Sequence, residues 1–474
     1  MNSLASRFRA ALGALAAALL LASCGGVGED GSGAAPPDTL TTGVVNGFGS
    51  VVVNGIHFDV RGADISVDGV PGRAQADLSV GMVVEVTGTV AADGATGTAT
   101  RVAYESLLRG TVDDLPAART VRVLGQRVSV DDTTVFAGAA GTDDLRSGDR
   151  LQVSGFRDPD GSLRATWVSR ESGTGQPQLT AFITSVTGTT VRLAGLDVNI
   201  ATATFSGVTV GTLAAGQLVR VVLQAAPVSG AAVAARLSLI DSRVPDALRK
   251  RQLQGIVAQW DAAAGRFSLN GQPVQVNAAT QYQDGTAASL NTGVRIEVTG
   301  QLSADRVLRA DKLRFLGGAI TGYARGKVTG VDVNNKRFSL LDTPGVEIRL
   351  RADTLLDDTA ILGGVLSLAN LGVGDEVLVL GRANGARIDA ELVQRLPRLT
   401  PGAGAAGPVT AISGSTLTVL GITVAANGAT FLDALGLPVS QTAFLAALRT
   451  NDEVRAEGSY AVGVLTARTV RRVR

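Results

Sequence analysis

The stretch VVVNGIHFDV covers residues 51–60 and joins a Val-rich segment to an alternating one through Asn54-Gly55. Asn-Gly between two apolar runs is the strongest short-range signal for a two-residue β-hairpin turn of type I′. After the turn, Ile56 and Phe58 share one face, as expected for a half-buried strand. This stretch therefore predicts a tight hairpin within a β-rich chain.

The glycine of this hairpin and the alternating strand after it recur six times along the chain. The six glycines are Gly55, Gly125, Gly195, Gly271, Gly345 and Gly421. Nine residues later, five copies carry a threonine: Thr134, Thr204, Thr280, Thr354 and Thr430. Each copy ends with an apolar alternation and, in most copies, an Ala-x-x-Val or Ala-x-x-Leu motif. Self-similarity at a spacing of roughly 70 residues indicates a tandem array of small units.

A Leu-x-x-Gly element precedes the last two strands of each copy, with Asn451 in place of glycine in the sixth. Asn tolerates the left-handed conformation that a turn glycine usually supplies. The leucines, which we expect in the core, are Leu78, Leu145, Leu213, Leu290, Leu371 and Leu448. Five strands with a short helix or turn between the third and fourth is the layout of the OB-fold. The sequence therefore predicts an all-β fold of six tandem small five-stranded OB-like barrels.

Linkers that contain Gly or Pro separate the copies, near 172–177, 242–250 and 397–404, and should be accessible to proteases. The expected boundaries are 41–106 for repeat 1, 108–171 for repeat 2, 178–241 for repeat 3, 251–316 for repeat 4, 321–396 for repeat 5 and 405–473 for repeat 6.

The composition excludes several functional classes. The chain has 59 glycines in 474 residues, with 4% aromatic and 18% charged residues, which favours many short strands and turns. One cysteine and one histidine exclude an intrachain disulfide framework, an iron–sulfur cluster and a Cys/His zinc site. The net charge of +1 gives no bulk attraction to nucleic acid. We expect no cofactor, no metal site and no nucleic-acid partner.

Residues 1–23 have the pattern of an export signal. Two arginines precede an apolar run over 10–21, which is too short to span a bilayer comfortably. The run ends in Leu-Ala-Ser-Cys at 21–24, which resembles the lipobox of bacterial lipoproteins. That resemblance implies that Cys24 carries a diacylglyceryl anchor, and the Gly after it resembles an outer-membrane sorting signal. Residues 24–40 lack apolar periodicity and predict a flexible tether.

Three further features point to a known family. They are the Val-Asn-Gly turn, the stretch Leu-x-x-Gly-Asp-x-Val-Glu-Val-x-Gly, most complete at 78–88 and 145–155, and the closing Ala-Thr-Arg-Val at 99–102. They resemble proteobacterial lipoproteins built from tandem copies of a domain of unknown function, number fifty-six-sixty-six. The resemblance runs from about residue 41 to the end and implies OB-like barrels on an exported, lipid-anchored protein, with no established activity. Repeat 5 departs from it by an insertion at 342–345, and repeat 3 carries Gln217 where Asp is typical.

His57 is the first candidate for catalysis or metal binding. It alternates with Ile56 and Phe58, so its side chain is expected on the outer face of its strand, next to Asp59. The corresponding position is Arg in repeat 2 and Pro in repeat 4, which does not fit a shared function. We therefore interpret His57 as a surface residue and expect no catalytic residues.

Carboxylates crowd in repeat 2 alone. They are Asp113, Asp114, Asp131, Asp132, Asp143, Asp144 and Asp149. They could bind Ca²⁺, which needs six to eight oxygens, if loops brought them together. The Asp-Pro-Asp-Gly turn at 158–161 does not continue as an EF-hand loop, because Ser169 stands where the bidentate Glu should be. We favour solvated turn carboxylates.

These observations predict a non-catalytic, lipid-anchored protein of the cell envelope, on the periplasmic or outer face of the outer membrane. Its tandem barrels would act as a spacer, scaffold or interaction surface, with an envelope glycan or protein as partner. The alternative is a receptor-like module that binds an oligosaccharide or other envelope polymer through exposed aromatic residues, for which Trp167 and Trp260 are the candidates.

Overall fold

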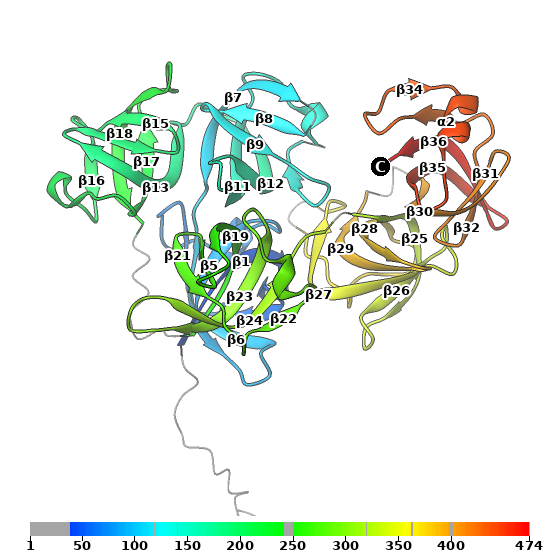
Figure 1. Ribbon diagram of the computed structural model, residues 1–474, viewed down its shortest axis with the longest axis horizontal. Helices are drawn as coiled ribbons and strands as arrows, with labels where there is room; N and C mark the ends of the chain where they lie inside the picture. Colours follow the sequence, from blue (N-terminus) through cyan, green and yellow to red (C-terminus); the bar gives the residue numbers. More distant parts are fainter. Residues whose placement is uncertain are drawn as a thin grey trace, which may run out of the picture. The chain divides into compact units, whose positions relative to one another are not determined.

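The computed structural model describes residues 38–117, 119–139, 141–240, 250–318, 320–361, 364–397 and 402–473 (Figure 1). The predicted signal peptide, most of the tether and Cys24 lie outside these residues. The fold is all-β with short helical segments, as predicted. In the part of the chain that is described, no helix is long and apolar enough to cross a membrane.

Repeats 1 to 3 each contain six strands and one 3₁₀ helix. Repeat 1 has β1 (Asp38–Gly47), β2 (Val51–Val53), β3 (Ile56–Asp59), β4 (Asp64–Val67), η2 (Gln75–Asp77), β5 (Val83–Val90) and β6 (Thr96–Tyr104). Repeat 2 has β7 (Leu108–Ala117), β8 (Thr120–Val123), β9 (Gln126–Ser129), β10 (Val135–Ala137), η3 (Thr142–Asp144), β11 (Arg150–Arg157) and β12 (Leu163–Glu171). Repeat 3 has β13 (Gln178–Thr187), β14 (Thr190–Leu193), β15 (Leu196–Asn199), β16 (Thr204–Ser206), η4 (Val210–Thr212), β17 (Leu218–Leu223) and β18 (Ala231–Leu239).

Repeats 4 to 6 continue the pattern with local changes. Repeat 4 has β19 (Lys250–Asp261), β20 (Arg266–Leu269), β21 (Gln272–Gln275), β22 (Gln281–Gln283), η5 (Ala287–Ser289), β23 (Arg295–Leu302) and β24 (Leu308–Phe315). Repeat 5 has β25 (Gly322–Asp332), β26 (Arg337–Leu340), β27 (Glu347–Asp358), β28 (Glu376–Asn384) and β29 (Arg387–Arg395). Repeat 6 has β30 (Ala403–Ser413), β31 (Thr416–Val419), β32 (Ile422–Ala425), β33 (Thr430–Leu432), β34 (Pro438–Val439), α2 (Gln441–Ala447), β35 (Glu453–Ala461) and β36 (Val464–Arg472).

The strands form three twelve-stranded sheets, and each sheet combines two repeats. In repeat 1, five strands are hydrogen bonded in a closed circuit in the order β1-β2-β3-β6-β5 and back to β1. Repeat 2 closes in the same order through β7-β8-β9-β12-β11, and repeat 5 through β25-β26-β27-β29-β28. The strand pairs of repeats 3, 4 and 6 follow this order too. Because each five-strand circuit is closed, few of its strands have a free edge.

Most repeats contain a short additional strand that the sequence patterns did not predict. β4, β10, β16, β22 and β33 each pair in parallel with the last strand of their repeat, and the second half of β27 does so in repeat 5. The recurrent threonine lies here. In repeats 2, 4 and 5 its hydroxyl donates to the carbonyl of the alanine that opens the closing motif, from Thr134 to Ala165 at 2.9 Å, from Thr280 to Ala310 at 2.8 Å and from Thr354 to Ala390 at 2.7 Å. Two motifs of the repeat are therefore joined by one hydrogen bond.

The turn chemistry agrees with the predictions. Asn54 and Gly55 have φ values of +54° and +81°, and Asn270 and Gly271 have +49° and +78°, as a type I′ turn requires. Asn451, which replaces the Leu-x-x-Gly glycine in repeat 6, has a φ of +74°. The six leucines of this element are all buried, with 2% to 9% of each exposed. The short helix lies between the third and fourth circuit strands in repeats 1 to 4 and repeat 6, where we expected it.

The repeats share sheets in pairs that the sequence did not predict. β1 of repeat 1 pairs in parallel with β19 of repeat 4, from Thr39 opposite Lys250 to Thr42 opposite Leu253. β7 of repeat 2 pairs with β13 of repeat 3, and β25 of repeat 5 with β30 of repeat 6. Buried apolar clusters likewise cross repeat boundaries. Two of the three sheets join neighbouring repeats, but the sheet of repeats 1 and 4 shows that proximity in the sequence does not alone decide which repeats share a sheet.

Candidate ligand-binding cavity

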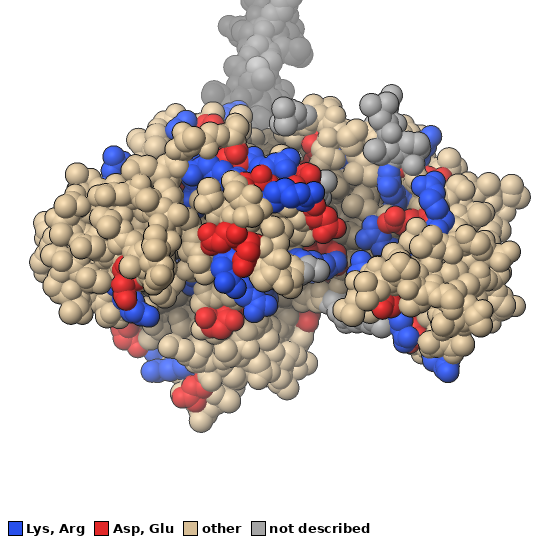
Figure 2. Space-filling view, turned by 90° about the horizontal axis from the view of Figure 1, so that it is seen from above, with Lys and Arg blue, Asp and Glu red and all other residues tan. Residues whose placement is uncertain are grey.

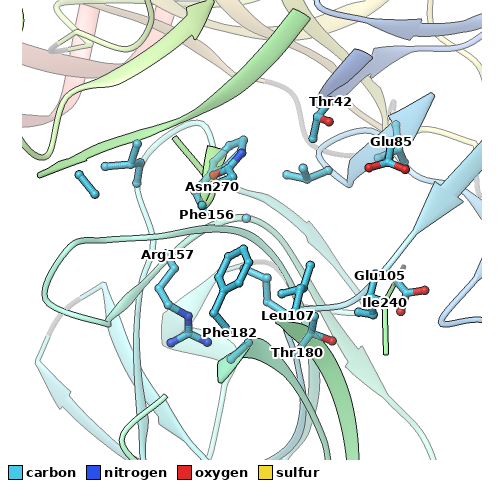
Figure 3. A pocket seen from close by; sticks show the side chains of 18 of the residues that line it. Thr42, Glu85, Glu105, Leu107, Phe156, Arg157, Thr180, Phe182, Ile240 and Asn270 are labelled. Carbon is cyan, nitrogen blue, oxygen red and sulfur yellow. The ribbon is translucent and has the colours of Figure 1, made fainter. Parts of the chain in front are cut away.

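A cavity of about 320 Å³ is lined by residues of repeats 1, 2, 3 and 4 (Figure 3). Its size falls within the range of small-molecule binding pockets. Repeat 1 contributes Thr42 and Glu85, repeat 2 Phe156 and Arg157, repeat 3 Thr180 and Phe182, and repeat 4 Ile256 and Asn270. Glu105, near the end of repeat 1, and Leu107, between repeats 1 and 2, also line it. The cavity thus depends on the packing of repeats against one another.

Two aromatic rings form much of its apolar wall. Phe156 on β11 is buried, and the guanidinium carbon of Arg295 lies 5.2 Å from the centre of its ring. Phe182 on β13 packs against the Asn270-Gly271 turn of repeat 4. A Cβ on Gly271 would lie 2.6 Å from Cζ of Phe182, so both the positive φ and this close approach require glycine. These contacts fix the two rings where repeats 2, 3 and 4 meet.

Two carboxylates lie on the repeat 1 side of the cavity. Burial raises the pKa of Glu85, and the charges of Arg101 and Arg251 oppose this rise. Burial also raises the pKa of Glu105, against the opposing effect of Arg220, whose Nη1 lies 2.5 Å from Glu105 Oε2. Both carboxyl groups are therefore held in surroundings that solvate charge poorly.

Arg157 lines the cavity from repeat 2. Burial lowers its pKa to about 10. Its Nη1 donates to the carbonyl of Gly161 at 2.6 Å and to Gln126 Oε1 at 3.3 Å, whereas its Nη2 is buried and makes no hydrogen bond to a described residue. In the view of Figure 3, Arg157 lies on one side of Phe182, and Glu85 and Glu105 lie on the other.

The surface shown in Figure 2 carries basic and acidic side chains in close mixture, beside wide areas without charge. Because the two charges are mixed, this face presents no continuous field of one sign that would attract a polyanion.

Among the described residues, no group of three or more His, Cys, Asp or Glu side chains has an arrangement that could hold a metal ion.

His57 lies where the sequence placed it. Its side chain is exposed between buried Ile56 and Phe58, and its Nδ1 lies 3.2 Å from Ser50 Oγ. Neighbouring Asp59 is paired with Arg61 at 2.7 Å, which helps to hold the pKa of Asp59 at about 2. The side-chain and backbone hydrogen bonds from Arg61 are the main causes of that shift. The prediction of an outward-facing histidine beside a carboxylate is confirmed.

The carboxylates of repeat 2 are engaged in separate turns and ion pairs. Asp113 accepts a bond from the backbone N–H of Gly125, and Asp131 accepts bonds from Thr133. Asp149 accepts one from the backbone N–H of Arg146 at 2.9 Å. These bonds stabilise the turns locally. The hypothesis of a calcium site in this repeat stays without support from the described residues.

The two tryptophans differ in exposure. We expected both to be exposed, and for Trp167 this is wrong: 4% of it is accessible, and its ring packs edge-on against Tyr104 of repeat 1, with centroids 6.4 Å apart. The neighbouring repeat covers a strand face that repeat 2 alone would leave open. Trp260 is half-buried and contacts Phe267 edge-on at 6.0 Å. Whether either residue binds a ligand stays a prediction.

The sequence patterns assigned no ligand-binding role to the residues that line this cavity. Glu85 alternates with Val84 and Val86 on β5, so its pattern is that of a solvent-facing side chain. Other repeats cover this outer face, and covering by a distant segment leaves no mark in local periodicity. For this reason the sequence patterns predicted no binding site at this cavity.

Comparison with known families agrees with the repeat pattern. The family model described as "Domain of unknown function (DUF5666)" matches residues 41–103, 109–169, 254–314 and 406–471, which is more than half of the chain. These segments lie in repeats 1, 2, 4 and 6. Repeats 3 and 5, where the sequence departs from the motif, keep the same order of paired strands. A search of curated proteins gave no match. The chain therefore belongs to the DUF5666 family of domains of unknown function.

Proposed function

We propose that this protein is a non-catalytic scaffold of the cell envelope, anchored by a lipid on Cys24, with six OB-like barrels that present an interaction surface. The observation that carries the proposal is the pairing of repeat 1 with repeat 4 through β1 and β19. A spacer would gain reach from repeats that touch only their neighbours in sequence. Pairing across two intervening repeats instead favours a fixed arrangement of surfaces.

The closed five-strand circuits support the OB-like assignment. In repeat 1 the third circuit strand, β3, runs parallel to the last one, β6, while the other circuit pairs are antiparallel. The 3₁₀ helix η2 lies between the third and fourth circuit strands, and the other repeats with a helix place it likewise. A five-stranded Greek-key barrel with this insertion is the OB layout, whose surfaces often serve recognition.

Cleavage between repeats 3 and 4 tests the scaffold. A protease site introduced at 241–249 would separate repeats 1–3 from repeats 4–6. Because β1 and β19 belong to different halves, the scaffold predicts that the two fragments stay together in size-exclusion chromatography without denaturant. Fragments that elute separately, each folded, would favour independent beads and therefore the spacer.

The anchor is tested by Cys24→Ala. A lipid-anchored protein should move from the membrane fraction to the soluble fraction when Cys24 is replaced, because the variant lacks the acyl chains, two or more of which give firm anchoring. Ser23→Ala, which keeps the thiol, is the matched control. A Cys24→Ala protein that still sediments with membranes after a carbonate wash would exclude this anchor.

A receptor-like module for an envelope oligosaccharide is the second candidate, favoured by half-buried Trp260 beside Phe267. Aromatic faces stack on the apolar faces of sugars, and here the backbone N–H of Trp260 is bonded to Thr292 Oγ1 at 3.2 Å, which fixes the strand. Calorimetric titration with peptidoglycan-derived oligosaccharides should show binding that Trp260→Ala removes and Trp260→Phe retains. Equal binding by both variants would exclude this surface.

A further inference from the structure

Glu85 lines the cavity with hydrogen-bond acceptor sites that no described residue occupies. Within the described residues it accepts no hydrogen bond, and its one ion pair is with Arg101 Nη1, at 3.5 Å. One quarter of its side chain is accessible, and it lines the cavity. A carboxylate can accept about four hydrogen bonds, so a donor placed in the cavity would find free acceptor sites.

The second carboxylate, Glu105, lies on the same side of the cavity in Figure 3. Its ion pair with Arg220 leaves acceptor sites as well. A cation placed near these two groups would favour their charged forms, which burial disfavours. The acidic side of the cavity is therefore suited to a positively charged donor.

The arginines that line the cavity are less suited to an anion. Arg157 uses Nη1 for the Gly161 carbonyl and Gln126, and its Nη2 is shielded from the accessible space. Arg101 is 45% exposed and paired with Glu85, so solvent screens its charge. An anionic ligand would have to break existing hydrogen bonds or compete with a carboxylate.

The rest of the wall suits an apolar body. Leu107, Phe156, Phe182 and Ile256 line the space, which at about 320 Å³ exceeds what a few waters need. Aromatic faces also attract cations. We propose that this cavity binds a small organic cation, a primary ammonium on an aromatic or aliphatic body, with the ammonium donating to Glu85 and the body packed against Phe156 and Phe182. This site rests on the packing of repeats 1 to 4 that the proposed scaffold also requires, and it does not involve Trp260.

Three probes of similar shape test the charge of the ligand on the purified full chain. They are 2-phenylethylammonium, neutral 2-phenylethanol and anionic 3-phenylpropanoate, each titrated calorimetrically at neutral pH. The ammonium should bind about tenfold or more tightly than the alcohol, as expected for a hydrogen bond to a charged group. The anion should bind most weakly of the three.

Variants of the chain locate the site. Glu85→Gln keeps the shape and should remove the preference for the ammonium over the alcohol. Glu347→Gln, the same change on a partly exposed carboxylate of repeat 5, should leave it intact. Ala258→Phe, at another lining position, should fill the cavity and weaken all probes. Unfolding midpoints of each variant show whether the fold is retained.

Three outcomes would overturn the proposal. They are tightest binding of the anion, binding of the ammonium that survives Glu85→Gln, and no binding of any probe to the folded chain. The first would point to Arg157 as the recognition group. The association of the cleaved halves is measured without any probe, so a cavity that binds no probe and a scaffold that does not hold together give distinguishable results.

Discussion

Repeats 2 and 3 share one sheet through β7 and β13, yet they build the same hairpin from different residues. In repeat 2, Gly110 lies next to the turn residue Leu124, and a Cβ on Gly110 would lie 2.6 Å from Leu124 Cγ. In repeat 3 the corresponding residues are Ala181 and Ala194. Both turn residues have positive φ, +50° at Leu124 and +48° at Ala194. A large turn residue is therefore found where the strand residue next to it is glycine, and a small turn residue where that strand residue is alanine.

The turn before the fourth circuit strand shows the same principle. In repeat 2, Asp149 Oδ2 accepts a bond from the backbone N–H of Arg146, and in repeat 3 Gln217 Oε1 accepts one from Ala214, both at 2.9 Å. Gln217 departs from the family motif, but its amide oxygen makes the same bond. The two repeats keep the same contact or hydrogen bond, although they make it with different residue types.

The largest effect should come from the leucine that both repeats keep. Leu145→Ala removes a side chain that is 2% exposed, and it should cost about 2 to 5 kcal/mol in repeat 2. Leu213→Ala, at 9% exposure in repeat 3, should cost less because its site is less enclosed. Native-state hydrogen exchange, measured repeat by repeat, reports the loss.

Leu115→Ala is the control for this experiment, because Leu115 is 38% exposed in the same repeat. If the two buried leucines behaved like this control, they would not be core residues, despite their recurrence in the sequence.

The next effect concerns the bulge between the last two strands. In repeat 2 the register shifts between Ser154 and Gly155, and a Cβ on Gly155 would lie 2.1 Å from the carbonyl oxygen of Arg164. Repeat 3 shifts between Val222 and Leu223, so it accommodates a side chain there. Gly155→Ala should therefore cost about 2 to 3 kcal/mol, since the backbone must move.

Gly211→Ala in η4 is the matched control, because nothing lies within 4 Å of the added Cβ and the change should stay within about 0.5 kcal/mol. The same exchange measurement compares the two. A Gly155→Ala chain as stable as this control would show that the bulge of repeat 2 can relax to the form found in repeat 3.

Local signals predicted much of each repeat. The turn at Asn54-Gly55, the burial of Leu145 and the outward side chain of His57 follow from spacing and residue type, and the structure agrees with each. These features depend on contacts within a few residues or within one hairpin. A sequence pattern can therefore specify them directly.

Contacts between repeats were not predictable in this way. Trp167 is buried because Tyr104 of another repeat covers it, and Glu85 lines a cavity because four repeats meet there. The strand pair β1–β19 joins segments that are more than 200 residues apart. Such pairings depend on the fit of whole surfaces, and an alternating strand pattern is the same whether its outer face meets water or another repeat.

The smallest effect should come from the strand and turn positions of the hairpin in repeat 3, Ala181 and Ala194. In repeat 1, Asn54 donates from Nδ2 to the carbonyl of Thr42 at 3.1 Å, and a Cβ on Gly43 would lie 1.9 Å from Asn54 Oδ1. Ala194→Asn alone should therefore gain little in repeat 3, because the Cβ of Ala181 occupies the corresponding space. Ala181→Gly alone should cost about 0.5 to 1 kcal/mol, as glycine does within a strand. Together the two changes should recreate the repeat 1 arrangement, and the double variant should be more stable than the sum of the single effects predicts, by about 1 kcal/mol.

Hydrogen exchange of repeat 3 in the parent chain, the two single variants and the double variant measures the coupling. Strict additivity would mean that the two positions vary independently, and that the match of glycine with large turn residues has no energetic basis.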